Sequence, residues 1–148
     1  MNPDPEDARI HHFADFAEGR VEQRDYVVSE AVYEHFLAAF DDRSPIHVDE
    51  AYAHSRGLPG RVMHGAILNG FLSHFVGMHF PGKSSLLLAV DLRYGQPFLL
   101  GETLRLEARV AQRVESQRVI VLHLTFTNLT RGGITARGKA QVQLAEES

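Results

Sequence analysis

The chain has 148 residues, enough for one domain with a hydrophobic core and too few for two domains of ordinary size. Hydrophobic residues make up 44% and charged residues 23%, as in ordinary globular proteins, and the net charge of −4 argues against a nucleic-acid partner. The absence of cysteine excludes disulfides, thiol nucleophiles and cysteine-based zinc sites.

The N-terminus contains two prolines and mixed charges without periodicity, so we expect a flexible tail over residues 1–12 and a single domain over 13–148. It lacks the basic start and apolar run of a secretory signal. The longest apolar stretch, residues 64–80, is interrupted by polar residues and is too short to span a membrane. We therefore expect a cytoplasmic protein without a membrane partner.

The first half of the chain predicts one strand and two short helices. The strand is expected at residues 20–28, and a helix follows from Glu30 to Phe40 with Ser29 as its N-cap. The polar segment 41–45 ends this helix, because Pro45 disfavours helical geometry at the residue before it. A second helix is expected from about Asp49 to Arg56.

Residues 64–80 are apolar on nearly every face, which predicts a helix surrounded by protein. Small residues recur at helical spacing within it: Ala66, Gly70, Ser73 and Gly77. This small-residue stripe indicates close packing of the helix against a sheet.

The second half has the pattern of strands. Four segments are rich in β-branched and apolar residues and are separated by turn signals: 84–94, 103–115, 118–128 and 133–144. Their short connections predict an antiparallel meander with one buried face. One buried helix and a curved antiparallel sheet together predict an α+β protein in which the sheet wraps around the helix, as in the hot-dog fold.

The turn after the first helix carries a candidate acid–base pair, Asp42 and His47. A histidine exchanges protons near neutral pH, and a neighbouring carboxylate tunes its tautomer and basicity. A water held between the two could be deprotonated. On this spacing alone, Asp42 could equally cap the next helix while His47 packs.

A second candidate segment, residues 62–65, begins the buried helix. Backbone N–H groups at a helix N-terminus lack partners and favour negative charge. Gly65 would let a ligand approach the amide, as an oxyanion hole for a thioester carbonyl requires. The alternative is that the glycine only helps a helix begin in a crowded place.

The two segments together, and their order, resemble the MaoC-like, (R)-specific enoyl-CoA hydratase family from about residue 13 to 144. The matching positions are Phe36, Asp42, Pro45, Ile46, His47, His64, Gly65 and Ser73, with further similarity at 13–19 and 94–102. Asp41 stands where the family has a glycine, and Ser44 where it has an asparagine. We expect Ser44 to order the turn less well and Asp41 to add a like charge beside Asp42.

The resemblance implies a hot-dog enzyme that hydrates a 2-enoyl thioester of coenzyme A or of an acyl carrier protein, or catalyses the reverse dehydration. It assigns acid–base catalysis to Asp42 and His47 and carbonyl binding to Gly65, with Ser73 supporting Asp42. Ser44 and His64 complete the expected substrate-binding set. No metal or cofactor is expected, apart from coenzyme A as part of the substrate. The resemblance also implies a homodimer joined edge to edge, for which residues 103–128 offer long strands.

Three alternatives stay open on the sequence. A hot-dog thioesterase would place a carboxylate on the central helix, and residues 64–80 contain none. A non-catalytic thioester-binding domain would fit the departures at Asp41 and Ser44. A hydratase for a dicarboxylic or otherwise unusual acyl group would want extra cations, for which Arg43, Arg61 and Arg93 are candidates.

Overall fold

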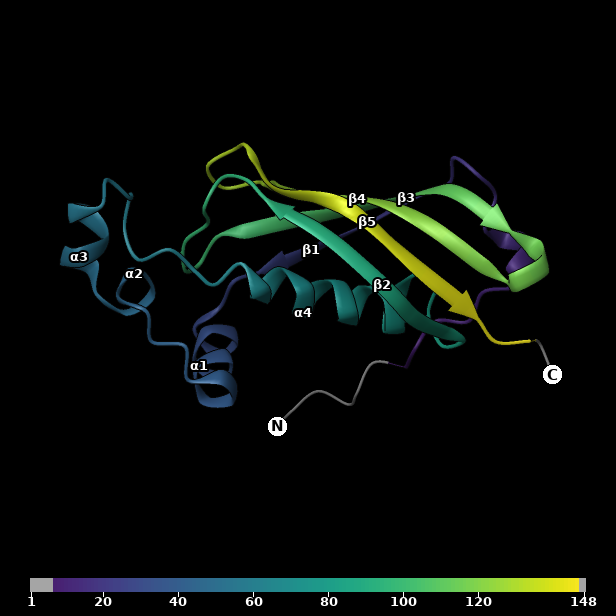
Figure 1. Cartoon of the computed structure of the whole chain (residues 1–148), viewed down its shortest axis with the longest axis horizontal. Coiled ribbons are helices and arrows are strands. Elements are labelled where there is room, and N and C mark those ends of the chain that lie inside the picture. The colour runs from purple at the N-terminus through teal and green to yellow at the C-terminus, as the bar shows by residue number, and fades with distance from the viewer. Residues whose placement is uncertain (1–6, 147–148) are drawn as a thin grey trace.

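Five antiparallel strands form a single curved sheet with the order β1-β3-β4-β5-β2. In the computed structural model, which describes residues 7–146, they are β1 (Val21–Val27), β2 (Ser85–Tyr94), β3 (Thr103–Val114), β4 (Val119–Asn128) and β5 (Ile134–Leu144). Helix α4 (Ala66–His74) lies along one face of this sheet (Figure 1). The arrangement is the hot-dog fold that the sequence predicted.

Alternation of side chains explains how the sheet covers the helix. In β3, Leu104, Leu106, Ala108 and Val110 are buried, and the residues between them face outward. The same period-2 pattern continues in β4 and β5, so their apolar side chains form one continuous inner face. All five predicted strands are present within one residue of the expected ends at either side.

The predicted meander holds only for β3, β4 and β5. Strand β2 precedes β3 in the chain but pairs with β5, at the far edge of the sheet, while β1 pairs with β3. The strands of residues 103–128 therefore lie inside the sheet, and the expectation that they offer an edge is wrong. The free edges belong to β1 and β2, because β3 and β4 already have partners on both sides.

The expected continuous helix over 64–80 consists of α4 and a following π-helical turn, η2 (Phe75–His79). Its bulky side chains recur every three or four residues and pack against the sheet: Ile67, Leu68, Phe71, Leu72, Phe75 and Val76. The small-residue stripe lies elsewhere. Ala66, Gly70 and Ser73 are exposed, so the predicted role of this stripe in helix–sheet packing is wrong.

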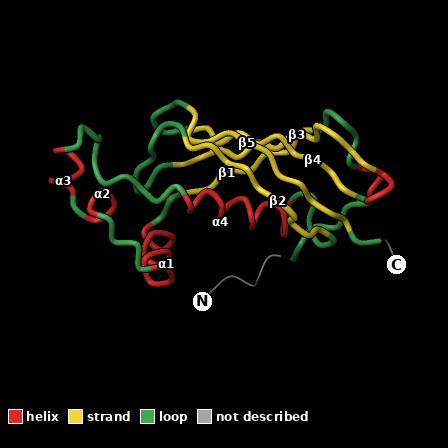
Figure 2. Tube along the Cα trace, in the orientation of Figure 1, coloured by secondary structure: helices red, strands yellow, loops and turns green. Residues whose placement is uncertain are grey.

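A group of helices extends beyond one end of the sheet (Figure 2). Helix α1 (Glu30–Phe40) matches the prediction, and its N-cap Ser29 accepts a hydrogen bond from the Val32 amide. A single turn, α2 (Pro45–Val48), was not expected, although proline is favourable at the first position of a helix. Helix α3 (Glu50–Ser55) is capped by Asp49, which excludes Asp42 as its cap.

Two 3-10 turns complete the structure, η1 (Phe13–Asp15) and η3 (Glu115–Gln117). Residues 9–12, expected within a flexible tail, pack against the end of the central helix. The Arg9 amide donates to the Met78 carbonyl, and the His11 ring contacts Phe16 and Phe80. Residues 1–6 of the predicted tail lie outside the described residues. No helix among residues 7–146 is long and apolar enough to cross a membrane.

Candidate active site

Helix α1 ends at Asp41, whose backbone has a φ of 51°. This left-handed conformation favours glycine, and for another residue it costs roughly 1–2 kcal/mol. The Asp41 carboxylate lies 2.7 Å from Arg43 Nε and is largely exposed. Asp41 therefore faces solvent and Arg43 rather than the side chain of Asp42, contrary to the concern that it adds a like charge to the site.

Asp42 follows at the mouth of the turn with its side chain 52% exposed. Its Oδ1 accepts a hydrogen bond of 3.2 Å from the Ser44 amide, which holds the turn closed. Ser44 is the N-cap of α2, but its hydroxyl makes no capping hydrogen bond. The carboxylate of Asp42, rather than the Ser44 side chain, thus orders the turn and leaves Oδ2 free to face the site.

His47 lies on α2 with a fixed ring. Its Nδ1 lies 2.7 Å from the Val62 carbonyl oxygen, which can only accept a hydrogen bond, so Nδ1 carries the proton in the neutral ring. The Nε2 lone pair is then directed toward Asp42. Tyr33 fixes the backbone as well, because its hydroxyl donates to the His47 carbonyl at 2.7 Å.

His64 is the third member of the cluster, with only 2% of its side chain exposed. Its Nε2 donates to the Asp42 carbonyl at 2.7 Å, and its ring stacks between Phe36 and His47, with centroids 4.5 and 3.9 Å away. Burial lowers the pKa of His64, a shift that the hydrogen bond to Asp42 partly opposes. His64 therefore supports the turn as a neutral ring, with Nδ1 buried and unpartnered.

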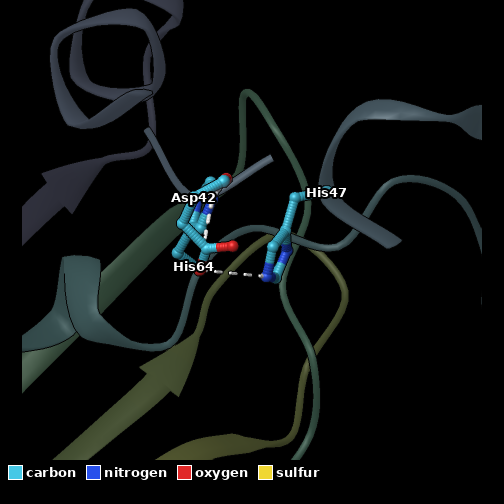
Figure 3. Close-up of side chains that lie close together, drawn as sticks. All are labelled: Asp42, His47 and His64. Atoms are coloured by element: carbon cyan, nitrogen blue, oxygen red, sulfur yellow. Dashed lines mark hydrogen bonds and ion pairs between the residues drawn. The ribbon is translucent and has the colours of Figure 1, made fainter. Parts of the chain in front are cut away.

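These contacts bring Asp42, His47 and His64 together from three segments (Figure 3). Asp42 Oδ2 lies 4.0 Å from Nε2 of His47 and 4.0 Å from Nε2 of His64. A separation of 4.0 Å is too long for a direct hydrogen bond, but one water can bridge it. The site can therefore hold a water between a carboxylate and an imidazole lone pair.

Among the described residues, the same three side chains form a group that could hold a metal ion. Their ligand atoms lie within 4.8 Å of one another, although the three residues are well separated in the sequence. His64 Nε2 is already bonded to the Asp42 carbonyl, so a metal at this atom would have to displace a hydrogen bond of 2.7 Å.

Gly65 lies beside the cluster as the N-cap of α4, and no hydrogen bond within the described residues uses its amide N–H. The space beside its Cα is not empty. A Cβ at this position would lie 3.2–3.3 Å from three carbon atoms of the Tyr94 ring. Glycine therefore lets the Tyr94 ring approach this closely, and any side chain here would shift the ring, a contact that sequence reasoning missed.

Ser73 is not brought to the cluster. It lies eight residues after Gly65, about 12 Å along the helix axis, and is exposed. Within the described residues, no hydrogen bond joins it to Asp42, so the expected support of the carboxylate by Ser73 is absent from this structure.

An apolar groove of about 870 Å³ runs between α1 and α4. Its lining consists of Ala31, Val32, His35, Phe36, Ala39 and Phe40 from α1, and Ala66, Ile67, Asn69, Gly70 and Phe71 from α4. The groove reaches the cluster at Phe36, which stacks on His64, and at Ala66, which follows Gly65. It therefore offers an apolar ligand a place next to the cluster of Asp42, His47 and His64.

The sheet, the buried helix and the acid–base turn together define a hot-dog domain with a candidate site at the start of its central helix. A family model described as MaoC like domain matches residues 13–142. The chain therefore belongs to the MaoC-like domain family.

Known proteins agree with this assignment. The (R)-specific enoyl-CoA hydratase of Rhodospirillum rubrum is 27% identical over 139 residues, covering 94% of this chain and 95% of the relative. That of Aeromonas caviae is 31% identical over 110 residues, covering 74% and 81%. The unliganded R-hydratase PhaJ1 from Pseudomonas aeruginosa has a TM-score of 0.82 at 25% identity, covering 91% of this chain and 86% of that one.

The burial of His64 predicts a pH-dependent stability. Its folded pKa lies below 6.5, so below that pH the unfolded chain binds a proton that the folded chain does not. The free energy of unfolding should therefore be highest above pH 6.5 and fall as the pH is lowered, by up to about 1.4 kcal/mol per pH unit for each such histidine. Burial also lowers the pKa of His79, which adds to this effect.

Urea unfolding at several pH values between 5.5 and 7.5 checks this expectation. His64→Gln should flatten the dependence, whereas His35→Gln, at an exposed position, should leave it as in the wild type. An unchanged slope in His64→Gln would show that His64 is not held neutral by burial.

Proposed function

We propose that the chain catalyses (R)-specific hydration of a 2-enoyl-CoA, or the reverse dehydration of a 3-hydroxyacyl-CoA. The observation that carries this proposal is the 4.0 Å gap between Asp42 Oδ2 and the His47 Nε2 lone pair, beside the free amide of Gly65. The relatives named (R)-specific enoyl-CoA hydratase and 3-hydroxybutyryl-CoA dehydratase support the same reaction.

In the hydration direction, a water bridges the pair. The Asp42 carboxylate accepts a hydrogen bond from the water and orients it. His47 Nε2 removes the other proton of the water as the water oxygen bonds to the β-carbon. The electron pair of the double bond moves toward the thioester carbonyl. A proton then passes from the pair to the α-carbon, so that H and OH have been added across the double bond.

The Gly65 amide supplies the electrostatic part of this mechanism. Negative charge develops on the thioester oxygen as water attacks, and a free N–H at the start of a helix stabilises such charge. The donor is a backbone N–H, so this stabilisation does not depend on the protonation of a side chain. His64 directly precedes Gly65, and its ring donates a hydrogen bond to the Asp42 carbonyl. This bond holds the start of the helix next to the turn that carries Asp42.

The groove between α1 and α4 is the proposed site of the acyl chain. Its lining is predominantly apolar, and it begins at the residues that contact the cluster. Two of the arginines that could bind a dicarboxylic acyl group already form ion pairs. Arg43 pairs with Asp41, and Arg61 pairs with Glu50. Arg93 lines a different hollow, together with charged residues of the sheet. These contacts favour an uncharged acyl chain.

Replacing either member of the pair tests the mechanism. Asp42→Asn and His47→Ala should each lower kcat/KM for crotonyl-CoA by about 10²–10⁴-fold, since each removes one partner of the bridging water. The loss of absorbance of the conjugated thioester measures the rate. Addition of a chelator should leave the wild-type rate unchanged, because the proposal needs no metal.

Other outcomes would select the alternatives. Release of free thiol would indicate a thioesterase. Tight binding of thioesters by an inactive wild type would indicate a binding domain. Full activity in both variants would refute the assignment of the pair.

Gly70→Leu tests the acyl groove. Gly70 lines the groove, and no atom lies within 4 Å of a Cβ built there, so a side chain at this position can begin without a clash and extend into the groove. It should lower kcat/KM for 2-octenoyl-CoA by about tenfold or more and leave crotonyl-CoA nearly unaffected, because only the longer chain meets the added side chain. Gly70→Ala serves as the matched control. An equal loss for both substrates would place the acyl chain elsewhere.

We also propose that the chain forms a homodimer through the free edge of β2. This edge strand exposes Leu86 by 60% and Leu88 by 48%, and exposed apolar edges are rare in monomers. Pairing of β2 with a second copy would satisfy its free backbone groups and cover these leucines.

Sedimentation equilibrium of Leu86→Lys/Leu88→Lys tests the dimer. This variant should be monomeric at concentrations where the wild type is dimeric. Leu129→Lys, which changes an exposed leucine outside the strands, should remain a dimer. A dimeric double variant would place the interface elsewhere.

A further inference from the structure

The Tyr94 side chain lies against the start of the central helix. Tyr94 is the last residue of β2, and three of its ring carbons lie 3.2–3.3 Å from where a Cβ of Gly65 would be. Such distances are shorter than most contacts of a real Cβ, so the ring rests directly on the Gly65 backbone. No side chain at position 65 fits unless Tyr94 moves.

The hydroxyl group fixes the other end of this ring. Tyr94 Oη donates a hydrogen bond of 2.6 Å to Asn69 Oδ1. Asn69 lies four residues after Gly65, and therefore one turn further along the same side of α4. The ring thus spans the first turn of the helix, with its carbons against Gly65 and its hydroxyl at Asn69.

This placement connects the two parts of the proposed substrate site. Asn69 lines the apolar groove, and Gly65 carries the free amide N–H. Tyr94 is 54% exposed, so the side of the ring away from the helix is open to a ligand or to water.

We propose that Tyr94 is a positioning residue for the thioester, with Asn69 holding its ring in place. The ring closes one side of the helix start, so that a thioester carbonyl at Gly65 N–H is shielded there from water. A hydrogen bond to a developing oxyanion is stronger where water is excluded. This inference rests on the proposed function, because the thioester carbonyl is assigned to Gly65.

The proposal gives a second structural reason for a glycine at position 65. If Gly65 were required only for ligand access, an alanine there would block the ligand whatever residue stood at position 94. If it is required for the Tyr94 ring, an alanine acts by displacing that ring, and removing the ring should make the alanine harmless. The two explanations predict opposite results for a double variant.

The first comparison is between Tyr94→Phe and Tyr94→Leu, assayed with crotonyl-CoA. Tyr94→Leu removes the aromatic wall and should lower kcat by about tenfold or more with a smaller change in KM, because the shielding matters most as charge develops. Tyr94→Phe keeps the ring but loses the hydrogen bond to Asn69, so it should lose some activity, though less than Tyr94→Leu. Equal rates in Tyr94→Leu and the wild type would overturn the proposal while leaving the proposed function intact.

The second comparison is a double-mutant cycle with Gly65→Ala and Tyr94→Leu. Gly65→Ala alone should lose at least as much activity as Tyr94→Leu alone, and the double variant should lose no more than Tyr94→Leu. Additive losses would overturn the proposal. Thermal unfolding checks that each variant is folded, and the Phe and Leu comparison decides the question if Gly65→Ala does not fold.

Binding of hexanoyl-CoA, a thioester that cannot be hydrated, separates this inference from the proposed reaction. Isothermal calorimetry should show weaker binding to Tyr94→Leu than to Tyr94→Phe. An inactive wild type would refute the proposed hydration. The two affinities would still test whether Tyr94 positions the thioester, and equal affinities would overturn that role.

Discussion

The hydrogen bond from His47 Nδ1 to the Val62 carbonyl is the contact on which the candidate site depends. At 2.7 Å it fixes the tautomer of the ring, and only this tautomer directs a lone pair at Asp42. A backbone hydrogen bond joins the same two segments, because the Val62 amide donates to the Ile46 carbonyl at 3.0 Å. The acid–base turn is thereby joined to the segment that leads into α4, and the pair and the Gly65 amide are held in one frame.

The sheet holds this frame through the loop between β2 and β3. Val62 forms an isolated bridge with Leu99, and the Met63 amide donates to the Phe98 carbonyl. At the other end of the loop, the buried Glu102 carboxylate accepts hydrogen bonds from two side chains of the β4–β5 turn, Asn128 and Arg131. A buried carboxylate with such partners is costly to disturb. The curved sheet thus packs against α4 and also supports the backbone that holds His47.

The sequence predicted the strands and helices well because each has a local cause. The N-cap Ser29 and the alternating residues of β3 act within a few residues, whereas α1 ends at the left-handed Asp41 and Pro45 begins α2. Pairing between distant strands has no such local signal, so the position of β2 beside β5 was missed. Asp42 and His47 were selected as candidate site residues through a family resemblance. The carbonyl of Val62 and the ring of Tyr94 were not, because a backbone atom leaves no mark in a motif and Tyr94 meets Gly65 only in the fold. Ser73 was assigned to support Asp42 through the same resemblance, but in this structure it lies on an exposed side of α4, without a hydrogen bond to Asp42.

The stereochemistry of the reverse reaction tests the central claim most directly. The proposed site places the bridging water and its proton acceptors on one side of the bound thioester, so only one enantiomer of a 3-hydroxyacyl-CoA can present its hydroxyl to Asp42 and His47. Separate assays with (3R)- and (3S)-hydroxybutyryl-CoA, followed by the appearance of conjugated absorbance, should show dehydration of the (3R) form alone. Dehydration of the (3S) form, or of neither form with release of free thiol, would contradict the account.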